Sequence, residues 1–478
     1  MSSKLEQYLL EAAGKQKLEV ASDNLYREIA FDGGKERLGW VKPLPFSKIK
    51  ESLEKVSDVL EGKENFIFVG MGGSINGIKP LISLFGNKSF YTLDNLDPKA
   101  LARLFEGLKN PDKTLVVAIS KSGTTKETQL LASALREFFT NKYGNTQWPK
   151  HFLWLSDPES FLKIDSYGWS PVKKIPIQFD GKTDVGGRFS SPHTLIFILP
   201  LFLLLKRNLE ALEKIYSSFV SLQKEVNQRA CSLCEKSKNK KDAYFSPVVD
   251  GKSSRALSSW IVQLFQESLG SKREGLAVKT LTGQKQDSVF FPLRLSLEMG
   301  EEVVSLMSQM YFFQVFIAYY AACHRINFVA QEFVEKYKNQ MRELESQAGQ
   351  KEPIESIDIE EVLEQAKRRI TPEQKFIEIV LYFYPAPELI DRIKKMFARK
   401  FSQKKILVFV GSDWNHQSYQ AAFGSKDTFY VLLALSSYTQ QVEGVSNNTL
   451  LQNIETLQVI AKATHLTLKN KSLLFSLR

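Results

Sequence analysis

Two segments near the start of this chain repeat one pattern: a short apolar run, a turn of small polar residues, and a helical sequence. The first is NFIFVGMGGSING, residues 65–77, and the second is TLVVAISKSGTTKET, residues 114–128. HFLWLSDPES, residues 151–160, adds a further strand and turn. Strands that alternate with helices are typical of a layered α/β fold with a parallel sheet. The sequence therefore predicts that class of fold.

The same pattern returns in the second half of the chain. We expect a strand that ends near Asp250, a helix over 254–269, and strands within residues 288–296, 404–412 and 428–437. Helical, Leu- and Lys-rich sequence near 190–245 joins the two halves. We therefore predict two three-layer α/β/α domains with parallel sheets, plus helical N-terminal and connecting segments. The predicted boundaries are an N-terminal helical arm at 1–55, a first domain at 56–200, and a second domain at 201–478 with helical insertions and a C-terminal extension.

Charge and hydropathy narrow the kinds of partner. The chain carries 64 Lys and Arg against 53 Asp and Glu, a net charge of +11, which favours anionic partners in general. The basic residues are scattered and form no recognised nucleic-acid motif, so we expect no nucleic-acid partner. The longest apolar run that we identify, residues 194–205, is shorter than the ~20 residues of a membrane span and contains Pro200. It predicts a buried core helix, and we expect no membrane segment.

The chain has three cysteines, Cys231, Cys234 and Cys323. The first two form a CxxC pair, but no further zinc ligands follow at suitable spacing. The pattern therefore favours thiols on a helix without a metal role. The low cysteine count fits a reducing cytoplasm.

The small polar turns lie where a parallel sheet binds ligands, beyond the carboxyl ends of strands. A helix N-terminus there offers free N–H groups, glycine permits close approach, and hydroxyls donate hydrogen bonds to phosphate oxygens. Helix capping by Ser and Thr is the alternative explanation, but two such turns on successive strands favour a phosphate cradle. The predicted cradle residues are Gly73, Ser74, Ser120, Lys121, Ser122, Thr124 and Thr125. Neither turn is a GxxxxGK[ST] loop, so nucleoside triphosphate binding is not indicated.

GMGGS followed by SKSGTTKET resembles the sugar isomerase (SIS) domain, an α/β module that holds phosphosugars. VGGRFS at 185–190, QESLGS at 266–271 and INFVAQEFVEKYK at 326–338 resemble the motifs of the phosphoglucose isomerase family. RLGW at 37–40, SVFFPLRL and GSDWNHQSYQ at 411–420 are most similar to the isomerase portion of bacterial transaldolase–phosphoglucose isomerase fusion proteins. Because residue 1 starts close to that portion, we expect no transaldolase half.

The resemblance implies two SIS-type domains and an aldose–ketose isomerase that interconverts glucose-6-phosphate and fructose-6-phosphate through a cis-enediol, in glycolysis and gluconeogenesis. It implies a hexose phosphate substrate, no cofactor and no metal, a cytoplasmic location and a homodimer. Two alternatives remain: a non-catalytic phosphosugar-binding regulator, and an isomerase that also accepts mannose-6-phosphate. A regulator needs only the phosphate cradle, so a full set of catalytic residues argues against it.

By the same resemblance, Glu267 is the base that moves the C1–C2 proton, and Arg188 stabilises the enediolate. Lys338 assists ring opening, and Gln331 contacts the substrate. The chain departs from the family at FVAQEF, where the usual Pro, Asp and Gly of PFDQPG are missing, and at Ser271, where the family has Lys and Lys272 follows instead.

The ring-opening histidine has two candidates. His324 lies between the base and the late lysine, as in ordinary members of the family, but within an apolar helical pattern. His416 lies in NHQSYQ, beyond the lysine, where the fusion-type branch carries its histidine motif. We choose His416, because NHQSYQ keeps the H-x-x-Y-Q pattern of the family's histidine segment and because a core or helix-end role accounts better for His324.

Overall fold

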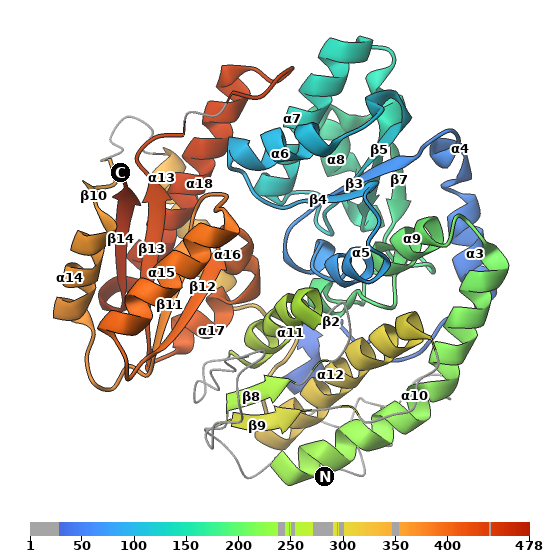
Figure 1. The fold of residues 1–478 in the computed structure, drawn as a ribbon. Coiled ribbons are helices and arrows are strands. Elements are labelled where there is room, and N and C mark those ends of the chain that lie inside the picture. The colour runs from blue at the N-terminus through green and yellow to red at the C-terminus, as the bar shows by residue number, and fades with distance from the viewer. Residues whose placement is uncertain are drawn as a thin grey trace. The chain divides into compact units, whose positions relative to one another are not determined.

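The computed structural model of this chain describes residues 28–237, 244–247, 249, 254–270, 290–293, 295, 301–346, 353–438 and 441–478. They form two compact units, each assembled from several stretches of chain (Figure 1). The first unit contains Met1–Thr92, Lys109–Thr125 and Pro149–Ala330. The second contains Leu93–Leu108, Lys126–Trp148 and Gln331–Arg478. Of the N-terminal helical arm predicted at 1–55, the first 27 residues lie outside the described residues.

The first unit is built on a five-stranded sheet with the order β4-β3-β5-β6-β7. Its strands are β3 (Asn65–Val69), β4 (Phe90–Leu93), β5 (Thr114–Ile119), β6 (Phe152–Ser156) and β7 (Lys173–Pro176). The pairs β3–β5, β5–β6 and β6–β7 are parallel. Every residue of β3, β5 and β6 is buried, as expected for a parallel sheet covered on both faces. The predicted α/β class and these three strands are confirmed.

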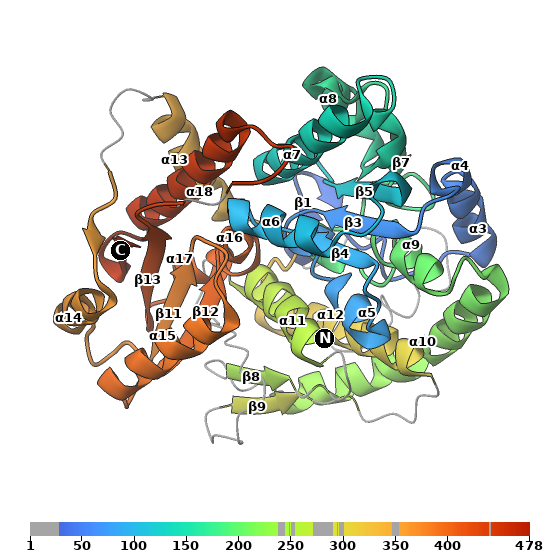
Figure 2. The same cartoon turned by 45° about the horizontal axis from the view of Figure 1, so that its top comes forward.

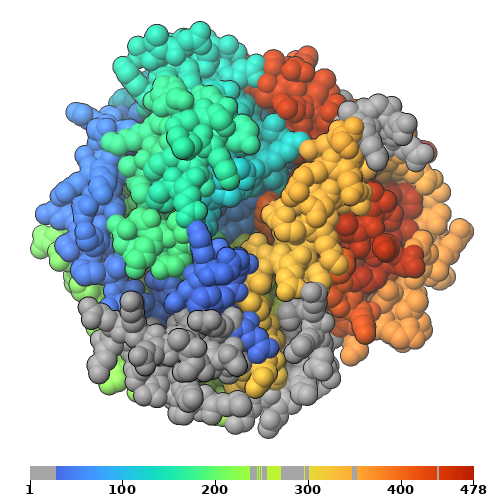
Figure 3. Space-filling model, turned by 180° about the vertical axis from the view of Figure 1, so that it is seen from behind, coloured from blue at the N-terminus to red at the C-terminus, as the bar shows by residue number. Residues whose placement is uncertain are grey.

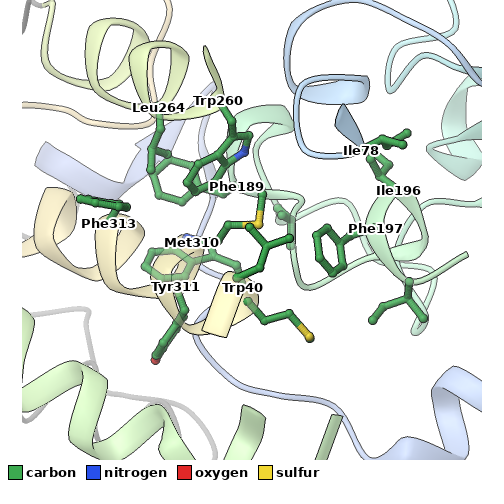
Figure 4. Close-up of a cluster of buried hydrophobic side chains, with 14 of the residues drawn as sticks. Trp40, Ile78, Phe189, Ile196, Phe197, Trp260, Leu264, Met310, Tyr311 and Phe313 are labelled. Carbon is green, nitrogen blue, oxygen red and sulfur yellow. The ribbon is translucent and has the colours of Figure 1, made fainter. Parts of the chain in front are cut away.

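Aromatic and aliphatic side chains form the core beneath this sheet. Figure 4 shows Trp40, Phe189, Trp260 and Tyr311 gathered in it. Trp40 stacks on Phe189 with ring centroids 5.0 Å apart. Helices α5 (Lys79–Phe85) and α9 (Leu195–Leu204) contribute to the same cluster, and α9 is buried along its whole length. The apolar run predicted to be a core helix is therefore confirmed as one.

Long helices complete the first unit: α3 (Phe46–Glu54), α10 (Leu209–Ser237), α11 (Ser254–Leu269) and α12 (Glu302–His324). The helix predicted over 254–269 is confirmed as α11. Strands β8 (Tyr244–Pro247) and β9 (Phe290–Leu293) pair with each other in parallel. Within the described part of the chain, α12 alone has the length and apolar composition to cross a membrane, and 89% of its apolar stretch is buried inside the protein, as in a core helix.

The second unit has its own five-stranded parallel sheet, in the order β10-β14-β13-β11-β12. Its strands are β10 (Ser356–Ile357), β11 (Phe376–Leu381), β12 (Lys405–Val410), β13 (Thr428–Leu435) and β14 (Ser472–Leu477). Helices α14 (Ile359–Arg369) and α15 (Pro387–Lys400) share one hydrophobic cluster with the sheet, and α18 (Asn447–Leu468) covers the opposite face (Figure 2). This is the predicted three-layer arrangement.

Further helices belong to this second unit: α6 (Pro98–Gly107), α7 (Lys126–Tyr143), α13 (Val334–Ser346), α16 (Asp413–Gln417) and α17 (Tyr419–Gly424). Both α7 and α13 pack along α18. The exposed side of α13 is visible in Figure 3, in yellow-orange. Short elements complete the chain: β1 (Phe31–Asp32), β2 (Lys35–Glu36), α4 (Ser57–Leu60) and α8 (Phe161–Ile164).

Each of the two units is made of several separate stretches of chain, whereas the domains predicted at 1–55, 56–200 and 201–478 are contiguous. Those predicted boundaries stay predictions. Elements β8, β9, α11 and α12 group with the first sheet, whereas the strands of the second sheet all lie at residues 356–477. The strands predicted within 288–296, 404–412 and 428–437 exist as β9, β12 and β13. The strand expected to end near Asp250 is β8, which ends at Pro247.

Candidate active site

The glycine turn after β3 lies directly against the turn that carries Arg188. A methyl group at Gly73 would lie 2.3 Å from the carbonyl carbon and oxygen of Gly187, and 2.6 Å from the backbone nitrogen of Arg188. These distances are far below van der Waals contact, so only glycine fits at position 73. The close approach of the two turns therefore fixes where the Arg188 backbone lies. Ser74, next to it, is half-buried, and its backbone N–H donates to Met71.

The Arg188 side chain is buried, with 2% of its surface exposed, and all three of its nitrogens are used. Nε donates to Ser268 Oγ at 2.8 Å, and one terminal nitrogen donates to the Glu267 carboxylate at 3.0 Å. The other donates to the Phe328 carbonyl oxygen at 2.6 Å. Charge-assisted bonds of this kind hold a guanidinium in one orientation. The structure therefore brings the predicted base and the predicted enediolate-stabilising residue together.

Glu267 lies near the C-terminal end of α11 and is 6% exposed. Its second carboxylate oxygen accepts a hydrogen bond from Gln263 Nε2 at 3.0 Å. Gln263 Oε1 in turn accepts from Asn76 Nδ2 at 3.1 Å, which ties the carboxylate to the GMGGSING turn. A buried carboxylate needs such partners, because an unpaired buried charge is costly. The hydrogen-bond chain thus fixes the rotamer of Glu267.

The hydroxyl turn after β5 is organised by hydrogen bonds among its own side chains. Ser120 Oγ donates to Thr125 Oγ1 at 3.1 Å, and Thr124 Oγ1 donates to Ser122 Oγ at 3.0 Å. Ser122 and Thr124 are exposed, whereas Ser120 is buried. Gly123 has a φ of +65°, and a methyl group there would lie 2.8 Å from Ile164 Cγ1. The turn therefore needs glycine at its centre and presents hydroxyls on its open side.

Lys121 belongs to the same turn, but its ammonium group is used within the protein. Nζ donates to the carbonyl oxygen of Thr183 at 3.2 Å and to that of Val185, and lies 3.7 Å from an Asp157 carboxylate oxygen. Burial lowers the pKa of Lys121. It also raises the pKa of Asp157 to about 6, against the opposing effect of Lys121. Lys121 therefore anchors the segment that leads to Arg188, and its contact with phosphate stays a prediction.

His416 lies on α16 in the second unit, with Nε2 2.9 Å from a carboxylate oxygen of Glu127. Burial opposes protonation of this imidazole, but the Glu127 charge outweighs it and raises the pKa of His416. Burial likewise disfavours the Glu127 carboxylate, but the charge of His416 outweighs it and lowers the pKa of Glu127. The two side chains form a buried ion pair. Glu127 is a partner of His416 that the sequence analysis did not single out, although it stands within SKSGTTKET.

Lys338 lies on α13 in the same unit. Its Nζ donates to Glu335 at 2.9 Å. The positive charge of Lys338 adds to the lowering of the Glu127 pKa and partly offsets the raising of the His416 pKa. Lys338, Glu127 and His416 therefore interact electrostatically. Gln331 is half-buried, and its carbonyl oxygen accepts from the Val334 N–H at the start of α13.

The predicted residues thus divide between the two units. The first unit holds the residues predicted as base, enediolate-stabilising arginine and phosphate cradle: Gly73, Ser74, Ser120, Lys121, Ser122, Thr124, Thr125, Arg188 and Glu267. The second unit holds Gln331, Lys338 and His416, together with Glu127. The alternative histidine, His324, is the last residue of α12, and its ring lies 4.3 Å from that of Tyr320. The departure at Ser271 and Lys272 lies outside the described residues.

The sheets, the two small polar turns and the buried Arg188–Glu267 pair define a layered parallel α/β protein with polar groups at the ends of its strands. Residues 45–227 match the family model of phosphoglucose isomerase. The match covers less than half of the chain, so it shows similarity to that family for this segment alone. The segment includes Arg188 and both turns, and it ends before Glu267, Lys338 and His416.

Curated relatives and one solved structure are also similar to this chain. The chain is 31% identical over 258 residues to the glucose-6-phosphate isomerase of Campylobacter jejuni, a match that covers 51% of this chain and 60% of the relative. It is 29% identical over 261 residues to the glucose-6-phosphate isomerase of Thermus thermophilus, covering 51% and 58%. The matches thus span about three fifths of those relatives. A crystal structure of a hypothetical protein from Thermus thermophilus has the same fold, with a TM-score of 0.51, 21% identity, and coverage of 72% of this chain and 94% of that one.

Proposed function

We propose that this protein is a glucose-6-phosphate isomerase, which interconverts glucose-6-phosphate and fructose-6-phosphate. The observation that carries the proposal is the buried pair of Arg188 and Glu267, whose Nη–Oε distance is 3.0 Å. Aldose–ketose isomerisation needs a carboxylate that takes a proton from C2 and returns it to C1, and a cation that stabilises the developing oxyanion. This pair supplies both groups on a rigid frame.

The hydroxyl turn would bind the sugar phosphate. Ser120, Ser122, Thr124 and Thr125 offer hydroxyl donors, and Ser74 lies on the neighbouring turn. A phosphate needs several donors that approach from one side, which the carboxyl ends of parallel strands provide. The phosphate is on C6, away from the reacting C1 and C2, so its binding positions the substrate and contributes to ground and transition states alike.

His416, which pairs with Glu127, would catalyse ring opening, and Lys338 would assist it. A carboxylate that raises the pKa of an imidazole keeps it protonated at higher pH, so it can donate a proton to the ring oxygen. The same imidazole, once neutral, can accept the proton of the anomeric hydroxyl. Gln331 would bind the substrate from the start of α13. We further propose a homodimer in the cytoplasm, the assembly and location that the family resemblance implies.

A coupled assay tests the proposal. Fructose-6-phosphate is supplied, and glucose-6-phosphate formation is followed as NADPH through glucose-6-phosphate dehydrogenase. We expect turnover in the wild type and its loss in Glu267→Gln. Binding of fructose-6-phosphate without turnover would instead establish the non-catalytic regulator.

The same assay separates a narrow from a broad isomerase. With mannose-6-phosphate as the sole sugar and no other isomerase added, NADPH forms only if the protein first makes fructose-6-phosphate and then glucose-6-phosphate. Activity from mannose-6-phosphate would therefore identify the dual phosphoglucose and phosphomannose isomerase.

A further inference from the structure

The three cysteines lie on two helices that pack against each other in the first unit. Cys231 and Cys234 are on α10, as the sequence predicted, and Cys323 is the penultimate residue of α12. The sulfur atoms of Cys234 and Cys323 are 3.9 Å apart although 89 residues separate them in sequence. Cys234 is buried, with 2% of its surface exposed, whereas Cys323 is exposed. One thiol therefore faces solvent and the other lies directly behind it.

We propose that Cys323 and Cys234 form a reversible disulfide by exchange with a small-molecule disulfide such as oxidised glutathione. The Cys323 thiolate attacks one sulfur of glutathione disulfide, so the glutathione S–S bond breaks and one glutathione thiolate leaves. The Cys234 thiol then loses its proton and attacks the Cys323 sulfur, which releases the second glutathione. Two protein thiols are oxidised, and one glutathione disulfide is reduced to two glutathione molecules.

Exposure and position set the order of these two steps. Of the two paired thiols, Cys323 is exposed and Cys234 is buried, so the first exchange with a bulky disulfide takes place at Cys323. The contact with Cys323, together with burial, raises the pKa of the Cys234 thiol, so this thiol stays protonated until its neighbour is activated. A disulfide bond is about 2.05 Å long, so the sulfurs must approach by roughly 2 Å. Cys323 lies in the last turn of α12 and its side chain is exposed.

The bond would fasten the end of α12 next to the site. Five residues after Cys323, the Phe328 carbonyl oxygen accepts a hydrogen bond from Arg188. Asn327 reinforces this segment: its side chain accepts from the Val329 and Ala330 N–H groups and donates to the Phe31 carbonyl. Oxidation would thus restrain the chain that supports Arg188. The proposal itself rests on the sulfur positions and is independent of the proposed isomerase activity.

The competing pairing involves Cys231, three residues before Cys234 on α10. The tryptic peptide 230–236 contains both cysteines, so digestion alone does not tell them apart. Cys231→Ser is therefore the matched control for Cys234→Ala. Cys323→Ser changes an exposed side chain, which keeps the test free from loss of folding.

The full chain is incubated in glutathione buffers of rising oxidised fraction, the remaining thiols are alkylated, and tryptic peptides are identified by mass spectrometry. We expect peptide 230–236 linked to peptide 295–325 in the wild type and in Cys231→Ser, and reversal by dithiothreitol. The link should be absent from Cys234→Ala and Cys323→Ser, and Cys234→Ala should accumulate the Cys323–glutathione mixed disulfide. The thermal midpoint should be several degrees higher for oxidised than for reduced wild type, with no such difference in Cys323→Ser. A wild type that stops at the mixed disulfide, or a link that vanishes in Cys231→Ser, would overturn the proposal.

Discussion

Glu127 and His416 each stabilise the charged form of the other, with a carboxylate oxygen 2.9 Å from the imidazole Nε2. The carboxylate comes from the first turn of α7 and the imidazole from α16, 289 residues apart in sequence. Both side chains are largely buried, so solvent and salt screen their interaction weakly. The pair converts an ordinary histidine into one that holds its proton at higher pH.

Glu127→Gln should therefore lower the pKa of His416, because burial would then act without the opposing carboxylate. The measurement is the pH titration of the His416 ring proton by NMR. Glu343→Gln, on the exposed side of α13, is the control and should leave the titration unchanged. An unaltered His416 pKa in Glu127→Gln would contradict the ion pair.

The ion pair also gives a defined pH window for stability. The pKa of His416 is raised above 6.5, so its contribution is complete below that pH and is lost as pH rises through the folded-state value. The pKa of Glu127 is lowered below 4.5, so its contribution is complete above that pH and is lost as pH falls through the folded-state value. Urea unfolding at several pH values should show this dependence, and Glu127→Gln should flatten it.

Glu267→Gln keeps the shape of the side chain and removes the proton acceptor, and its amide oxygen can keep one of the two hydrogen bonds that the carboxylate accepts from Arg188 and Gln263. If Glu267 is the base, kcat should fall about 10²–10⁴-fold, the usual contribution of a positioned general base. Exchange of the C2 proton of the sugar with deuterated solvent should disappear in parallel. A variant with near-normal turnover would place the base elsewhere.

His416→Ala should slow the reaction of closed-ring glucose-6-phosphate much more than that of an open-chain substrate. Ring opening and C1–C2 proton transfer are separate steps, and Arg188 and Glu267 remain intact in this variant. Steady-state rates on the two kinds of substrate give the comparison. An equal decrease in rate on both substrates would indicate a structural role for His416, and His324 would then be the candidate for ring opening.

Gly73→Ala should destabilise the protein, because the added methyl group meets the backbone of Gly187 at 2.3 Å. Overpacking of this kind typically costs about 1–3 kcal/mol, on the order of several degrees in thermal midpoint. Gly187→Ala is the matched control from the opposite turn, since a methyl group there meets nothing within 4 Å. Differential scanning calorimetry of both variants decides the matter: equal midpoints would show that the two turns do not touch.

Asp157 should make stability decrease as pH rises from about 4 to about 6. Burial raises its pKa from 3.8 to about 6, so the folded protein binds this proton more tightly than the unfolded chain does. Asp157→Asn should remove that slope from urea unfolding curves. The exposed Asp180→Asn is the control and should preserve it.

The strands that could be predicted are those whose apolar runs are uninterrupted, as in TLVVAI and TFYVLLAL. Strand β11, FIEIVL, escaped prediction because Glu378 breaks its apolar run. That carboxylate is fully buried and accepts a hydrogen bond from Trp414 Nε1 at 3.2 Å. The tryptophan is 36 residues away, so a local pattern cannot reveal that this charge has a partner. Strand β14, SLLFSL, was also not predicted.

In the candidate site, too, some features could be predicted from local motifs and others could not. The turns of Gly73 and Arg188 follow from glycine-rich motifs, since close backbone approach demands residues without side chains. The role of Glu127 depends on His416, which lies 289 residues further along the chain. The bonds of Lys121 to the carbonyls of Thr183 and Val185 likewise depend on tertiary structure. Local sequence predicts what a side chain offers, whereas packing decides which partner receives it.

The division of the chain into interleaved units has a consequence for its synthesis. Helices α6 and α7 leave the ribosome early, yet they belong to the unit whose sheet is encoded at residues 356–477. About three hundred further residues must be made before α18, against which α7 packs, is complete. During that interval α7 can pack on α6, where Phe105 stacks on Phe138, but the face of α7 that packs along α18 stays uncovered by α18. Neither unit is a contiguous stretch of the gene, so a ribosome that stalls before α18 releases a chain in which α7 lacks the helix it packs along.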